Sequence, residues 1–180
     1  MNDYFNTLLI SPTKVKSFGD IGINLDDSAI GAAIRISQNV YLKDIFGKDL
    51  VEHLQVLVYN KINRIDDSID DSGNTQYKTL LDEFIQPALA YKTTAELATT
   101  NHLKIRSMGT VKNSDTNVQP VDSTDMKALA EYYMTFFYDV INKTWDFLCE
   151  NKAAFSEIPE GFCSCRKKPL YGRTGLYLGK

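Results

Sequence analysis

The segment from residue 123 to about residue 155 does most to limit the possible folds of this chain. Large apolar side chains recur along it three and four residues apart, which is the spacing of one face of a helix. Ser123, Thr124 and Asp125 stand at its start, and these residue types cap helix N-termini. The pattern therefore predicts a helix of roughly 30 residues, about 45 Å long. Its apolar positions are Leu129, Tyr132, Tyr133, Phe136, Phe137, Val140, Ile141, Trp145, Phe147 and Leu148.

The apolar stripe of this helix is too wide for a single neighbouring helix to cover. The chain has 10 Tyr, 9 Phe and 1 Trp in 180 residues, and a large share of these rings lies in this one segment. Either other helices of the chain cover most of its circumference, or a second chain does. The sequence leaves both possibilities open.

Four helices are predicted before the long one. Ser11 and Pro12 are a suitable N-cap and first residue for a short helix. Three more helices are predicted over residues 26–41, 48–65 and 75–99. The predicted fold class is therefore mainly α: a helical bundle of about five helices with one long, aromatic-rich C-terminal helix.

Helical spacing also predicts which side chains of the earlier helices are buried. Arg35 and Gln38 are expected on the solvent side of the second helix, and Ile62 in the buried stripe of the third. Pro87 is expected to kink the fourth helix, because its ring removes one backbone hydrogen bond and crowds the preceding turn. The side chains expected on the inner side of the second helix are Ile30, Ala33, Ile34, Ser37, Val40 and Tyr41.

Alternation of apolar and polar residues begins the segment 103–122 and indicates extended backbone. This segment is therefore predicted to form a short extended or β-hairpin arm. Whether it is a hairpin, or a loop that orders only on assembly, stays open. Pro159 and Gly161 end the helical pattern, so the chain is expected to divide into a helical body, residues 1–160, and an extended C-terminal tail, residues 161–180.

Charge is distributed unevenly between the body and the tail. The net charge is −3, yet the tail holds five basic residues and no acidic one. The other 15 basic residues stand against 23 acidic ones, so the body sums to −8. An acidic body with a basic extension suits docking between like subunits or on an acidic partner, and a solvated, disordered terminus is the alternative. The basic residues of the tail are Arg166, Lys167, Lys168, Arg173 and Lys180.

The apolar residues of the tail indicate what it docks on. Two clusters of Leu and Tyr are separated by Gly172 and Gly175, like anchors on flexible joints. Such an arm fits a groove or a sheet edge of a partner protein. Basic residues interleaved with tyrosines also suit single-stranded nucleic acid, although the acidic body would repel it. The residues predicted to dock on a partner are Arg166, Lys167, Lys168, Leu170, Tyr171, Arg173, Leu176, Tyr177 and Leu178.

The sequence lacks the residue patterns of a catalytic or cofactor site. Its two histidines, His53 and His102, stand alone, which leaves a Ser-His-Asp or Cys-His arrangement without support. Three cysteines are an odd number, which argues against a disulfide framework and for synthesis in a reducing compartment. Cys163 and Cys165 together with Cys149 supply only three of the four ligands of a structural zinc site. We therefore expect no enzyme activity, no cofactor and no metal.

Targeting and membrane signals are also missing from the sequence. No apolar run is long enough for a signal peptide or a membrane span, so we expect a protein that is made in the cytoplasm and enters no membrane. The glycines form neither a GxGxxG nor a GxxxxGK[ST] pattern, so no nucleotide site is predicted.

The chain has a recognisable order of segments: LDDSAIGAAIRISQNVYLKDIFG, DLVEHL, an acidic loop, YKTLLDEFIQPALAYKTTAEL, RSMGTV and the long aromatic helix. This order resembles a family of small helical proteins encoded among the head genes of tailed phages and prophages of Bacteroidetes. Its members look like head–tail connector, or adaptor, subunits and include ring proteins of crAss-like phages. The resemblance covers roughly residues 7–155 and rests on residues 26–47, 77–97 and 107–111.

The resemblance implies a structural virion protein with a helical adaptor fold. Copies of such a subunit, usually twelve, form a ring at the neck of the virion that joins the portal to the tail and extends the DNA channel. The implied partners are other copies, the portal protein, other neck and tail proteins, and genomic DNA in passing contact. The C-terminal extension of such adaptors, which corresponds to Gly161–Lys180, commonly reaches the portal or a neighbouring subunit. The alternative function is a nucleic-acid-binding accessory protein that uses its basic tail.

Overall fold

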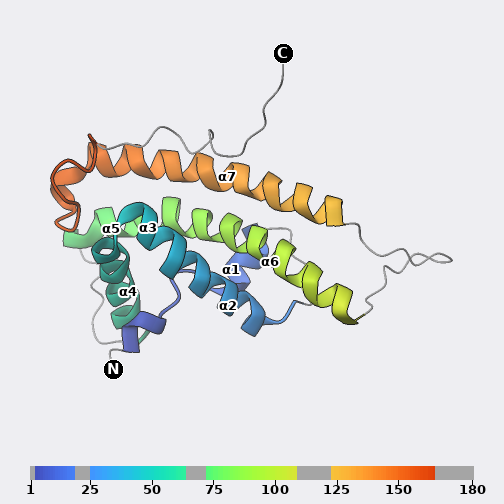
Figure 1. Ribbon diagram of the computed structural model, residues 1–180. Coiled ribbons are helices and arrows are strands. Elements are labelled where there is room, and N and C mark those ends of the chain that lie inside the picture. The colour runs from blue at the N-terminus through green and yellow to red at the C-terminus, as the bar shows by residue number, and fades with distance from the viewer. Residues whose placement is uncertain (1–2, 19–24, 64–71, 109–122, 165–180) are drawn as a thin grey trace, which may run out of the picture.

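The computed structural model describes residues 3–18, 25–63, 72–108 and 123–164. All regular structure in these residues is helical, which confirms the predicted mainly α bundle there. Two helices change their helical type along their length without a break, so the α-helices form five continuous rods. Figure 1 shows the two longest, α6 (Gln86–Met108) and α7 (Ser123–Glu150), lying side by side, with the N-terminal helices packed below α6 in this view.

The first two helices begin where the sequence predicts. α1 (Pro12–Phe18) is capped by Ser11, whose Oγ accepts a hydrogen bond from the Lys14 backbone N–H at 3.2 Å. α2 (Asp27–Ile36) is capped by the Asp26 carboxylate, which accepts a hydrogen bond from a backbone N–H of the first turn. In both cases a side-chain oxygen satisfies one of the N–H groups that a helix leaves without a partner at its start.

The helix that begins as α2 runs further than predicted. It passes through a π-helical turn, η2 (Ser37–Leu42), into α3 (Lys43–Phe46), and it ends at Gly47, whose positive φ of 92° favours glycine. A π turn takes up one more residue than an α turn. The side chains after Ile36 are therefore rotated relative to the pattern that an uninterrupted α-helix predicts.

α4 (Lys48–Ile62) follows and ends before the predicted residue 65. Both the backbone N–H and the Nδ2 of Asn63 donate to the Tyr59 carbonyl oxygen, at 3.0 and 2.9 Å, and these bonds satisfy a carbonyl group at the helix end. Ile62 is 66% exposed, so its predicted burial is wrong. As the last residue of the helix it lies beyond the buried stripe, which stops at Leu57.

The π-helical turn η2 reverses three predicted positions. Gln38, expected on the solvent side, is fully buried, whereas Val40 and Tyr41, expected inside, are exposed. Both ends of the buried amide form hydrogen bonds: its Nε2 donates to the Thr7 carbonyl oxygen at 2.9 Å, and its Oε1 accepts from the Leu9 N–H at 3.1 Å. The rotation thus places a polar side chain where the N-terminal segment needs hydrogen bonds.

Two further glutamines hold the same N-terminal segment, which follows the short 3₁₀ turn η1 (Asp3–Asn6). Gln55 Nε2 donates to the carbonyl oxygen of Thr7 at 3.3 Å, and Gln86 Nε2 donates to that of Leu9 at 3.0 Å. The segment has no strand beside it among the described residues, so the amides of three helices satisfy its backbone instead.

The fourth rod consists of α5 (Thr75–Thr79), a second π-helical turn η4 (Leu80–Ile85), and α6. The π turn ends directly before the turn that contains Pro87, which is the place where the sequence predicts a distortion. α6 continues through residues 103–108, so the extended arm predicted to begin there is wrong for these residues. Three alternating pairs do not distinguish a strand from a helix, and lengthening an existing helix requires no new nucleus. The rest of the predicted arm, residues 109–122, lies outside the described residues.

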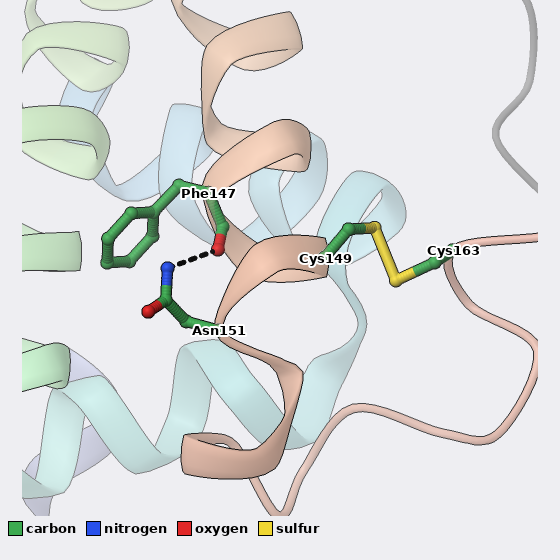
Figure 2. Close-up of a disulfide and its surroundings, with 4 residues drawn as sticks. All are labelled: Phe147, Cys149, Asn151 and Cys163. Carbon is green, nitrogen blue, oxygen red and sulfur yellow. Dashed lines mark hydrogen bonds between the residues drawn. A yellow bond between two sulfur atoms is a disulfide. The ribbon is translucent and has the colours of Figure 1, made fainter.

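α7 ends earlier than predicted, directly before Asn151, whose side chain caps the helix end. Asn151 donates from both its backbone N–H and its Nδ2 to the Phe147 carbonyl oxygen, at 3.0 and 2.9 Å (Figure 2). Asn63 ends α4 in the same way. After the 3₁₀ turn η5 (Lys152–Ala154), the chain turns back and buries Phe155 in the core.

Candidate docking surfaces

One apolar side of α7 is exposed. Leu129, Tyr132 and Phe136 lie three and four residues apart, hence on one side of the helix, and they are 41%, 57% and 37% exposed. Tyr133 and Phe137, which follow two of them directly, are buried. The structure therefore divides the wide stripe that the sequence predicts, because the chain covers one part of it and leaves the other part open.

Rings from two other helices extend this exposed side. The ring centroid of Tyr91, on α6, lies 5.3 Å from that of Phe136 and 6.4 Å from that of Phe18, on α1. Tyr132 meets Phe136 edge to face at 4.8 Å. Exposed groups of tyrosine and phenylalanine are typical of protein–protein contact surfaces. We call this set the aromatic face: Phe18, Tyr91, Leu129, Tyr132 and Phe136.

A second exposed apolar area lies on the helix that contains η2. The Lys92 ammonium, on α6, lies 3.7 Å from the ring centroid of Tyr41 and also pairs with the Glu96 carboxylate. Arg35 is exposed beside this area and adds a positive charge. We call the following residues the π-turn face: Ile36, Val40 and Tyr41.

The first residues of the predicted tail pack on α7. Phe162 stacks on Trp145, with ring centroids 4.0 Å apart and planes 11° from parallel. Cys163 forms a disulfide with Cys149, and the two Cα atoms are 5.6 Å apart (Figure 2). These contacts hold the chain against the body as far as Ser164. All the docking residues predicted in the tail lie beyond that point, outside the described residues.

The disulfide corrects an expectation drawn from the number of cysteines. An odd number excludes only complete pairing, and one pair forms here because the chain turns back between Cys149 and Cys163. Their Cα separation is in the middle of the range that disulfides adopt. Bonded sulfurs are not thiolates, so in this state neither residue is available as a zinc ligand beside Cys165.

A hydrogen-bonded network joins the loop after α7 to α4 and α5. The Glu157 carboxylate accepts a hydrogen bond from the Tyr77 hydroxyl at 2.7 Å and lies 2.8 Å from His53 Nδ1. The rings of His53 and Tyr77 stack, with centroids 4.7 Å apart. Burial, and after it the Glu157 carboxylate, raises the pKa of Tyr77 to about 12, so the phenol keeps its proton and remains a donor. The network therefore fixes the loop on the body.

Sequence reasoning missed this network. Glu157 is 80 residues from Tyr77 along the chain, and no local spacing connects the two.

Within the described residues, no group of three or more His, Cys, Asp and Glu side chains is placed to hold a metal ion. In the same residues, no helix combines the length and the apolar character that a membrane span needs.

Comparison with known proteins gives a family without a described function. No curated protein and no solved structure matches the chain. The model of one protein family matches residues 42–167, a range that runs from the last residue of η2 past the disulfide and covers more than half of the 180 residues. The chain therefore belongs to a family of unknown function, DUF6712.

Proposed function

We propose that the chain is a structural virion protein, a head–tail connector (adaptor) subunit. Its copies form a ring at the virion neck that joins the portal to the tail and extends the DNA channel. The aromatic face is the observation that carries the proposal, because an exposed group of rings on a helical body is suited to burial against another subunit. The order of segments that resembles phage adaptors supports the setting.

A closed ring of identical copies requires that one surface of a copy meets a different surface of the next copy. The aromatic face and the basic tail are two such unlike surfaces on one chain. The acidic body has a further use, since a channel wall with few basic groups offers few contacts that would hold DNA in place. The protein would be made in the host cytoplasm, without enzyme activity or membrane contact, and its partners would be the portal and other neck and tail proteins.

Co-expression with the portal protein of the same genome tests the proposal. Native mass spectrometry and negative-stain images should show several copies in a ring bound to the portal. Tyr132→Ser, on the aromatic face, should lower the number of copies bound, whereas Ile62→Ser, an exposed residue on α4, should leave it unchanged. A protein that stays monomeric and never joins the portal contradicts the proposal.

A nucleic-acid-binding accessory protein is the second candidate, and the concentration of basic residues in the tail favours it. Filter binding of single-stranded DNA at increasing salt separates the two candidates, using the full chain and a chain without residues 165–180. Affinity that falls steeply with salt and disappears with the tail favours the accessory protein. Weak binding by both chains favours the connector.

A further inference from the structure

We propose that residues 165–180 of one copy dock on the aromatic face of the next copy, so that the copies join head to tail. This inference rests on the proposed function only for the presence of neighbouring copies. It adds the identity of the surface that receives the tail and of the segment that fills it. Three kinds of observation support it: the side of α7 on which the tail begins, the charge of the two segments, and the length of the tail.

The tail begins from a fixed point. Phe162 stacks on Trp145, and Cys163 is bonded to Cys149, so the chain is attached at two successive residues to the C-terminal part of α7. Trp145 in turn lies against Phe46 of α3, with ring centroids 6.2 Å apart. The direction from which the tail leaves the body is therefore set by the fold.

The aromatic face lies on the other side of α7. Phe136 and Trp145 are nine residues apart. At 3.6 residues per turn this separation is about two and a half turns, so the two side chains point in opposite directions from the helix axis. Trp145 is covered by Phe162, whereas Phe136 remains exposed.

This arrangement favours a neighbouring copy over the same copy. To reach the aromatic face of its own chain, the tail would have to pass around α7. When copies stand side by side in one orientation, the tail side of one faces the aromatic side of the next. Such a contact between unlike surfaces is heterologous, and it closes into a ring when the rotation between copies closes.

Charge favours α7 as the receiving helix. It carries two basic residues, Lys127 and Lys143, against five acidic ones, while the tail carries five basic residues and no acidic one. The π-turn face is the less suitable receiver, because the exposed Arg35 stands next to Ile36 and repels a basic segment, while the charge of Lys92 is paired with that of Glu96. The acidic residues of α7 are Asp125, Glu131, Asp139, Asp146 and Glu150.

The tail is also long enough, and its apolar residues match the surface. From Ser164 to Leu170 an extended chain reaches about 20 Å, and to Leu178 about 46 Å, which is about the length of α7 itself. The two Leu/Tyr clusters therefore reach the aromatic face of a neighbour, while the basic residues before, between and after them lie along its acidic helix. Apolar and aromatic anchors of this kind usually carry most of the binding energy at an interface.

Mixing two variants of the full chain tests the inference. The face variant carries Tyr132→Ser and Phe136→Ser, and the tail variant carries Tyr171→Ser and Tyr177→Ser. Each variant alone should associate about tenfold or more weakly than the unaltered chain, measured by sedimentation velocity without reductant. An equal mixture should form dimers that grow no further, because the intact tail of the face variant meets the intact face of the tail variant.

Each other outcome overturns the inference. A tail variant that associates like the unaltered chain shows that the faces pair with each other. A mixture that stays monomeric, or an unaltered chain that is monomeric at its highest soluble concentration, shows that the tail does not join copies. Ile62→Ser is the control, because it removes an exposed apolar side chain elsewhere on the body, and circular dichroism checks that every variant is folded.

These outcomes are distinct from those that test the proposed function. Head-to-tail dimers in the mixture, together with no binding to the portal, support this inference and contradict the connector role. A tail variant that joins the portal in an unchanged ring supports the connector role and contradicts this inference.

Discussion

The two halves of α7 are built from similar residues but are completed in different ways. In the C-terminal half, Trp145 is covered by Phe162, and Phe147 packs edge to face with Phe155 at 6.0 Å. In the N-terminal half, Leu129, Tyr132 and Phe136 have no such cover from the part of the chain that the structure describes. The chain returns after α7 to cover one half of the helix and leaves one side of the other half exposed.

The aromatic stripe of α7 is therefore part of the core in one half of the helix and part of the surface in the other. The covered half is closed by a loop that is attached by a disulfide and by the Tyr77–Glu157 hydrogen bond. Nothing comparable closes the exposed half within the described residues. Substitutions in the covered half should therefore lower the stability of the monomer, and substitutions in the exposed half should alter association instead.

The largest loss of stability is expected from a substitution at Phe155, where the loop after α7 enters the core. Phe155 is 2% exposed, so Phe155→Ala leaves a cavity and should lower the free energy of unfolding by about 3–5 kcal/mol. Tyr132→Ala, at a residue that is 57% exposed, should lower it by less than about 1 kcal/mol. Urea denaturation measures both values. Equal losses would remove the distinction between the two halves.

The disulfide should have the next largest effect. It closes a loop with a sequence separation of 14, and Cys163→Ser should lower the free energy of unfolding by about 2–3 kcal/mol because the unfolded chain gains freedom. Reductant should cause a similar loss in the unaltered chain and none in Cys163→Ser. Cys165→Ser is the control and should unfold like the unaltered chain. A stability that does not respond to reductant contradicts this role.

The order and number of the helices could be predicted because local signals determine them. Ser11 caps the first helix as expected, and Asp26 caps the second helix at its predicted start. Helix ends were less predictable, because an asparagine cap such as Asn151 competes with helix formers that follow it. The inverted burial of Gln38 was not predictable, since it depends on a π turn and on a distant N-terminal segment.

The exposed surface was only partly predictable from the sequence. The wide apolar stripe indicated that a second chain was one way of covering it, but spacing alone does not show which rings stay uncovered. Tyr132 and Tyr133 are adjacent, and only packing against the rest of the fold makes one of them exposed and the other buried. The disulfide and the Glu157 network depend on contacts between distant parts of the chain, for which the sequence carries no local signal.

Removal of the Tyr77 hydroxyl should cause a smaller loss of stability, and this loss should depend on pH. Tyr77→Phe removes the hydrogen bond to Glu157 and should lower the free energy of unfolding by about 1–2 kcal/mol at neutral pH. The pKa of Tyr77 is raised from 10.0 to about 12 in the folded protein, so its contribution is complete below pH 10 and is lost as the pH rises toward 12.

Denaturation curves between pH 9 and pH 12 test whether stability falls as the pH rises. The interval over which it falls is defined to about one pH unit. The unaltered chain should lose more stability over this interval than Tyr77→Phe. Between pH 10 and pH 12 the unfolded chain has lost the Tyr77 proton while the folded chain keeps it, and Tyr77→Phe has no such proton. Tyr132→Phe is the matched control, since it removes the hydroxyl of an exposed tyrosine. Parallel curves for the unaltered chain and Tyr77→Phe would show that the loop does not depend on this proton.

The smallest effect on stability is expected from removal of the tail. Within the described residues, the last contacts that fix the chain to the body are made by Phe162 and Cys163, so deletion of residues 165–180 should change the free energy of unfolding by less than about 0.5 kcal/mol. The same deletion should abolish head-to-tail association. If the deletion instead destabilises the monomer, the tail covers the body of its own chain. The exposed half of α7 would then be completed in the same way as the covered half.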